Sequence, residues 1–162
     1  MVGLMFSIYS VAVIIFSPLV GKILGRIGNT NMITTGMVIM GLVFIAFGLV
    51  AKIENKNLLY FFGFSLRFIQ GAASAFVQTT TYSIATNDYP EKKEQVVGWV
   101  EAITGAGMIV GPILGSVLYS ALGYSNTFYI FGSLIIFFSF IVKLNFPEGD
   151  PTETEDDNFN NI

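Results

Sequence analysis

The sequence has 162 residues, of which 53% are hydrophobic and 12% are charged, whereas soluble domains carry about 25% charged residues. It contains no cysteine and no histidine, which excludes disulfides, thiolate metal sites and imidazole catalysis. The formal net charge is −3, but six of the eleven acidic residues lie in the last fifteen positions. No nucleophile–base pair, phosphate loop or basic patch interleaved with aromatics is visible. We therefore expect no enzyme, no cofactor and no nucleic-acid partner.

Five hydrophobic runs follow one another along the chain, separated by short polar links. A helix needs about 20 mostly apolar residues to cross a bilayer, and each run is long enough. The first run is not a signal peptide, because it has no basic n-region and continues into further spans. A soluble all-α bundle is disfavoured, because the runs have almost no charged face for water. We predict an all-α polytopic membrane protein with five transmembrane helices, at about residues 2–24, 32–51, 58–86, 95–121 and 126–145.

The basic residues predict the orientation. Five spans place alternate links on opposite sides, and cytoplasmic links carry an excess of lysine and arginine. One side holds Lys52 and Lys56, and the other holds Lys22, Arg26, Lys92, Lys93 and Lys143. The N-terminus is therefore expected outside or in a lumen, and the C-terminus in the cytoplasm. The acidic segment 147–162 is predicted to be a disordered cytoplasmic tail or the start of a central loop.

Ionisable residues inside a membrane are functional candidates by default. Arg67 lies about nine residues into its run, roughly 14 Å deep at about 1.5 Å per residue. Helical spacing places it on one face with other polar side chains, which we call the polar stripe: Arg67, Gln70, Ser74, Gln78, Thr81 and Tyr82. Lipid cannot satisfy these groups, so the stripe must face other helices or a watery cavity. Hydrogen-bonding between helices and cavity lining both remain open for Ser74 and Gln78, and we favour a functional role for Arg67.

Glu101 lies about six residues into the fourth run, roughly 9 Å from its start at about 1.5 Å per residue. A carboxylate near a helix start can simply favour the helix dipole. It is also the only carboxylate deep enough to carry a proton, since the chain has no histidine. Both interpretations remain open.

Two segments suggest an internal repeat, SPLVGKILGRIG at 17–28 and GPILGSVLYSALG at 111–123. Each has a proline followed three residues later by glycine, and each ends in glycine. Inverted repeats of this kind are typical of secondary transporters, although chance similarity between apolar helix ends is an alternative. At 105–115, which overlaps the start of the second segment, Gly107, Gly111 and Gly115 recur every four residues around Pro112, which predicts a bent helix with a face for close helix packing.

Three motifs carry a resemblance to a known family. GKILGRIGNT echoes the loop signature G-x-L-a-D-R-x-G-R-K through Gly21, Arg26 and Gly28, with Gly25 in place of the acid. RFIQGAASA, containing Arg67 and Gln70, matches R-x-x-q-G-x-g-a-a. The signature g-x8-G-x3-G-P-x2-G-[GS] is matched throughout, by Gly98, Gly107, Gly111, Pro112, Gly115 and Ser116. With these motifs the sequence resembles the drug:proton antiporter-like branch of the major facilitator superfamily, and it looks most like its vesicular amine and polyamine transporters.

The resemblance implies that the runs are helices two to six of an incomplete N-terminal half, and that the fourth-helix Arg67 takes part in proton coupling. We add Gln70 and Glu101 as further candidates for transport and proton coupling. It implies a small-molecule substrate, a proton and the lipid bilayer as partners, in a plasma or intracellular vesicle membrane. Because alternating access rocks one half against the other, we expect that this chain does not transport alone and needs a second transporter half. The alternative is a non-transporting membrane subunit that binds a protein partner.

Overall fold

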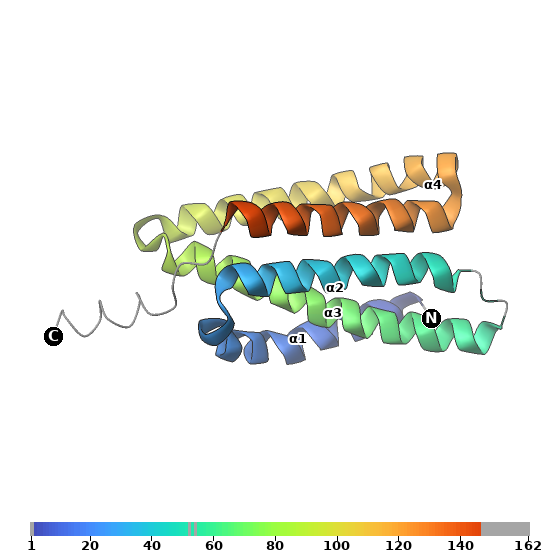
Figure 1. Cartoon of the computed structure of the whole chain (residues 1–162), viewed down its shortest axis with the longest axis horizontal. Helices are drawn as coiled ribbons and strands as arrows, with labels where there is room; N and C mark the ends of the chain where they lie inside the picture. Colours follow the sequence, from blue (N-terminus) through green and yellow to red (C-terminus); the bar gives the residue numbers. More distant parts are fainter. Residues whose placement is uncertain (1, 52, 54, 147–162) are drawn as a thin grey trace.

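The computed structural model describes residues 2–51, 53 and 55–146, and all of its regular elements are helical. They are α1 (Val2–Ile27), α2 (Asn29–Val50), α3 (Lys56–Asn87), the short 3-10 helix η1 (Pro90–Lys92) and α4 (Lys93–Asn145). The long helices lie roughly side by side in an elongated bundle (Figure 1). The predicted acidic tail, residues 147–162, lies outside the described residues.

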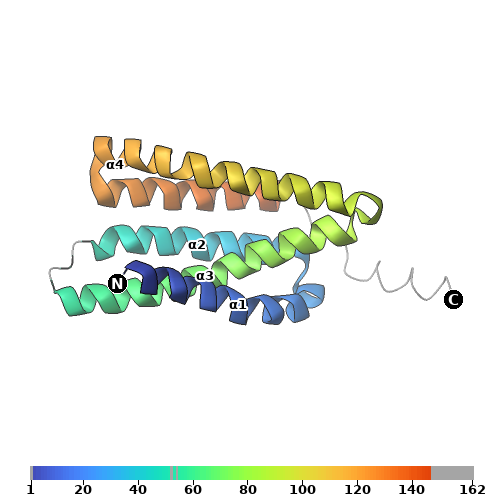
Figure 2. The ribbon, with the colours of Figure 1, turned by 180° about the vertical axis from the view of Figure 1, so that it is seen from behind.

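The fourth and fifth predicted helices belong to one element, α4, which turns back on itself at Gly123. This glycine has φ 77° and ψ 175° inside an otherwise helical segment. Figures 1 and 2 show the two arms of α4 antiparallel and side by side. Polar side chains just after the bend bond to carbonyls at the bend. The Asn126 Nδ2 donates to the Leu122 carbonyl, and the Thr127 Oγ1 donates to the Gly123 carbonyl. The structure therefore has four α-helices in its described residues, and five separate helices are not confirmed.

The junction between α1 and α2 repeats this geometry. Gly28 has φ 86° and ψ 151°, and Gly28 and Gly123 are the two positive-φ residues of the described chain. A positive φ is strongly disfavoured for residues with a Cβ, so both turns depend on glycine. These are the two glycines that the repeated segments align, which supports an internal repeat of two helix pairs.

Three elements are long and apolar enough to cross a membrane: Gly3–Ile27, Asn29–Val50 and the stretch Pro90–Asn145. α3 is not among them, although it has 32 residues, because the polar stripe lowers its hydropathy. Figures 1 and 2 show the α1–α2 junction, η1 and the last turns of α4 toward one end of the bundle. The Gly123 bend, the end of α2 and the start of α3 lie toward the other end.

Small residues hold the second arm of α4 against α2. A Cβ on Gly41 would meet the Gly132 carbonyl oxygen at 2.8 Å, and a Cβ on Gly132 would meet the Gly41 carbonyl oxygen at 2.7 Å. One end of this seam is tied by the hydroxyl of Ser139, which donates to the Thr34 carbonyl at 3.2 Å. Inside a bilayer, close backbone packing at small residues drives helix association in place of the hydrophobic effect.

α3 packs against α1 and α2. A Cβ on Gly71 would clash with the backbone of Tyr9, and a Cβ on Gly36 would meet Ala73 O at 2.9 Å. A buried apolar cluster joins the three helices beyond these contacts, formed by Val20, Leu24, Met32 and Ala75.

The first arm of α4 is the most open part of the described bundle, and every residue from 101 to 114 is exposed. A Cβ added at Gly98, Gly107, Gly111 or Gly115 would meet nothing within 4 Å. The predicted close-packing face is therefore open in the described chain, and the glycines that pack closely are those facing α1, α2 and the second arm.

Candidate functional site

Arg67 lies on α3 among aromatic side chains from two other helices. Its Nη1 donates to the Gln70 Oε1 at 3.0 Å. Its guanidinium carbon lies 5.5 Å from the ring centroid of Phe6 on α1 and 5.3 Å from that of Phe47 on α2. A cation over an aromatic face is stabilised by about 0.5–2 kcal/mol, more when desolvated. The guanidinium is thus held by one carboxamide and two rings, and none of these partners neutralises its charge.

A second polar cluster lies farther along the polar stripe. The Ser74 Oγ accepts hydrogen bonds from the Tyr9 hydroxyl at 2.7 Å and from the Gln78 Nε2 at 2.7 Å. Ser74 is buried at 4% exposure, whereas Gln78 is exposed. The sequence analysis missed Tyr9. It shares one face of α1 with Ala12 and Val20 at helical spacing, and both are buried, but only the structure shows that this face packs against α3.

Glu101 is brought to the end of the same stripe. Its Oε1 accepts a hydrogen bond from the hydroxyl of Tyr82, which joins α3 to the first arm of α4. Glu101 lies eight positions after Lys93, the first residue of α4, and the dipole effect is confined to about the first turn. The dipole interpretation of Glu101 is therefore weak. Thr81, by contrast, forms its hydrogen bond within α3, because its hydroxyl donates to the Val77 carbonyl at 2.8 Å.

The loop-motif residues occupy the end of α1. Arg26 lies in its last turn, Gly28 makes the junction, and Gly21 has nothing within 4 Å of an added Cβ. Pro112 lies inside the first arm of α4, and Ser116 is exposed beside it. These residues lie on α1, at its junction with α2 and on α4, whereas the polar stripe lies on α3.

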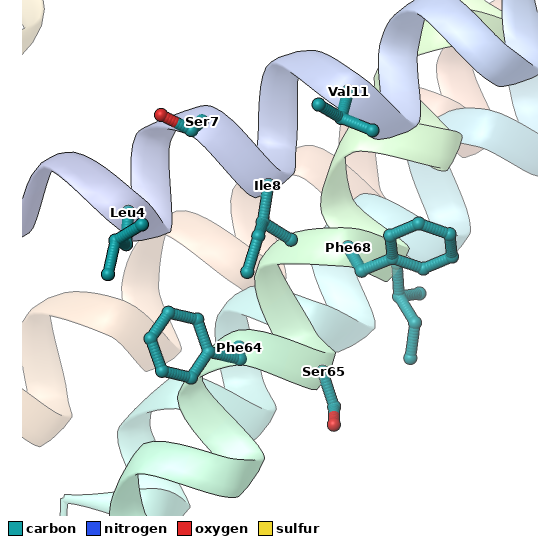
Figure 3. A pocket seen from close by; sticks show the side chains of 8 residues that line it. Leu4, Ser7, Ile8, Val11, Phe64, Ser65 and Phe68 are labelled. Carbon is teal, nitrogen blue, oxygen red and sulfur yellow. The ribbon is translucent and has the colours of Figure 1, made fainter. Parts of the chain in front are cut away.

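The larger cavity, about 720 Å³, is a groove between α1 and α3 (Figure 3). It faces away from the polar stripe, since its α3 residues Ser65, Phe68 and Ile69 lie roughly opposite Gln70 and Ser74 at about 100° per residue. Its two hydroxyls, on Ser7 and Ser65, donate to carbonyls of their own helices. The groove is therefore apolar and differs from the polar site.

The smaller cavity, about 350 Å³, lies between α2 and both arms of α4 and has mostly aromatic walls. Its lining residues are Phe44, Gly115, Tyr119, Tyr124, Thr127, Phe128 and Phe131. The Phe47 ring, which covers Arg67, lies 5.8 Å from the Phe128 ring. This cavity therefore adjoins the Arg67 environment through neighbouring, tilted aromatic rings. No cluster of metal-ligating side chains occurs among residues 2–51, 53 and 55–146.

Long apolar helices that carry a polar, charged stripe are the pattern of an integral membrane protein. The profile of the Major Facilitator Superfamily matches residues 1–161. The chain therefore belongs to the Major Facilitator Superfamily, and the resemblance inferred from its motifs is confirmed.

Similar proteins include vesicular transporters and drug efflux pumps. The chain is 29% identical to the mouse MFS-type transporter SLC18B1, over 84% of this chain and 30% of the relative. It is 26% identical to the human vesicular acetylcholine transporter, over 84% and 25%, respectively. It is 28% identical to the Streptococcus pneumoniae multi-drug resistance efflux pump PmrA, over 91% and 35%. The chain thus spans about a third or less of these relatives, none of which is named as an enzyme. No solved structure matches.

Proposed function

We propose that this chain forms part of a proton-coupled antiporter that exchanges protons for small organic cations, amines or drugs. The observation that carries the proposal is Arg67, a cation held between α1, α2 and α3 by Gln70 and two aromatic rings. A charge kept inside a membrane bundle indicates a substrate or proton pathway. The names of the vesicular and drug-efflux relatives favour organic cations as the substrate class.

Glu101 is the proposed proton carrier. As a carboxylate it accepts the hydrogen bond of Tyr82, which links α3 to the first arm of α4. A protonated carboxyl is a weaker acceptor than a carboxylate, so proton binding weakens this link. The first arm has few other contacts with the described residues, so proton binding at Glu101 would free it to move relative to α3.

We propose five membrane crossings, with each arm of α4 crossing once. The bend at Gly123 and the length of both arms support this assignment. The ends of the bundle differ in charge, because Lys22, Arg26, Lys92, Lys93 and Lys143 gather at the end that contains η1. By the positive-inside rule that end is cytoplasmic, and the N-terminus is outside or lumenal.

Single cysteines test the topology cleanly, because the chain has none of its own. An impermeant maleimide applied to intact cells should label Asn126→Cys at the bend. It should label Tyr89→Cys near η1 only after the membrane is permeabilised. Labelling of both positions from the same side would contradict a crossing by the first arm of α4.

Transport requires a second helical bundle, because alternating access rocks one bundle against another. The test is a chimera in which this chain replaces the matched segment of mouse SLC18B1. Vesicles containing the chimera should take up a fluorescent organic cation when the interior is acidic, and uptake should stop when an ionophore collapses the pH gradient. Vesicles containing the chain alone should take up none. An inactive chimera that inserts and folds normally would favour the alternative, a membrane subunit that binds a protein partner.

A further inference from the structure

Tyr9 lies where α1 packs closely against α3, beside the polar stripe. Its backbone carbonyl lies against Gly71, where a Cβ would clash. Its hydroxyl reaches past this contact to the buried Ser74 Oγ at 2.7 Å. One residue therefore joins α1 to α3 twice, once through the backbone and once through a side-chain hydrogen bond.

The second hydrogen bond at Ser74 extends this link to an exposed group. A serine oxygen has two acceptor sites, and Tyr9 and Gln78 each donate to it. One N–H of Gln78 is thereby fixed. Within the described residues nothing donates a hydrogen bond to the Gln78 Oε1, and the side chain is exposed. Its carboxamide oxygen is thus held in place and is free to accept a hydrogen bond.

We propose that Tyr9 is a positioning residue for substrate, which acts through Ser74 to hold the Gln78 carboxamide oxygen toward an N–H or O–H donor on the transported molecule. The inference rests on the proposed transport function, and it narrows the substrate class to organic cations that carry a hydrogen-bond donor. A primary, secondary or protonated tertiary amine fits this requirement, whereas a quaternary ammonium does not.

The chain offers a direct readout, because its only glutamines are Gln70, Gln78 and Gln95. Selective ¹⁵N labelling of glutamine side chains in nanodiscs therefore gives three NH₂ signals. Tyr9→Phe removes only the donor hydroxyl, and Ser74→Ala removes only the acceptor. Both changes should move the Gln78 signal and leave the Gln95 signal in place. Tyr60→Phe is the matched control, because Tyr60 is an exposed tyrosine on α3 outside the site.

The same variants are then measured in the uptake chimera. Loss of one neutral hydrogen bond weakens binding by about 1 kcal/mol of free energy, which corresponds to about a fivefold lower affinity. Tyr9→Phe should therefore raise KM for a protonated amine about fivefold without lowering the maximal rate. Ser74→Thr, which keeps the hydroxyl, should retain the wild-type KM. A quaternary ammonium lacks the donor, so its uptake should be weaker than that of the protonated amine, and Tyr9→Phe should not weaken it further.

An unmoved Gln78 signal in Tyr9→Phe would overturn the inference, and so would a moved signal with unchanged KM. Loss of maximal rate with unchanged KM would indicate a purely structural role and would also overturn it. If the wild-type chimera shows no uptake, the proposed function fails. The NMR comparison still decides whether Tyr9 positions Gln78, so the two failures are distinguishable.

Discussion

Replacing Gly132 with leucine should destabilise the protein at the interface between α2 and the second arm of α4. A Cβ at Gly132 would lie 2.7 Å from the Gly41 carbonyl oxygen and 3.1 Å from the Ile45 backbone nitrogen. Both atoms belong to the α2 backbone, so they cannot rotate away as a side-chain tip could. Overpacking typically destabilises by about 1–3 kcal/mol, and we expect the upper end of this range. Thermal unfolding in nanodiscs should show a clearly lower Tm for Gly132→Leu.

Gly105→Leu is the matched control, since an added Cβ there would meet nothing within 4 Å. Replacing a helical glycine improves helix propensity by roughly 1 kcal/mol, so this variant should be as stable as the wild type or more stable. If both leucines lowered the Tm equally, the seam between α2 and the second arm of α4 would not be what holds the bundle together.

Arg67→Ala should strongly slow pH-driven uptake by the chimera. Removal of the guanidinium leaves Gln70 without its donor and removes the cation from the rings of Phe6 and Phe47. A hydrogen bond to a charged group contributes about 1.5–3 kcal/mol, which corresponds to roughly a tenfold to hundredfold loss. Initial rates of uptake under an imposed pH gradient are the measurement.

Arg67→Lys separates charge from geometry. A lysine keeps the charge but loses the planar fork of donors, so it should restore part of the pH-driven rate. If Arg67→Ala left pH-driven uptake unchanged while the protein inserted normally, Arg67 would have no role in coupling.

The sequence could point only to the part of the candidate site that polar side chains mark within apolar runs. Arg67, Gln70 and Ser74 stand out because polar residues are rare in apolar runs, and the structure brings Ser74 and Gln78 together. Tyr9 could not be identified in the same way, because a tyrosine in an apolar run is consistent with packing alone. Its role depends on which helix faces it, and spacing along one helix does not specify that partner.

The glycines show the same limit. The four-residue spacing of Gly107, Gly111 and Gly115 predicts a packing face, yet a Cβ added at any of them would meet nothing within 4 Å among the described residues. Gly41 and Gly132 pack closely without any such motif, because their contact depends on the register between α2 and α4. The predicted helix ends were also approximate. We expected a polar link between residues 121 and 126, but α4 changes direction at Gly123 and is helical on both sides of it.

The central claim is that this chain contributes to the exchange of an organic cation for a proton, and the most direct measurement follows both fluxes together. Vesicles containing the chimera are loaded at acidic pH with a pH-sensitive dye, and a protonated amine is added outside. The account predicts that the interior becomes less acidic as the amine enters, and that Arg67→Ala strongly reduces both signals. Amine uptake without any movement of protons, or uptake driven equally well with no pH gradient, would contradict it.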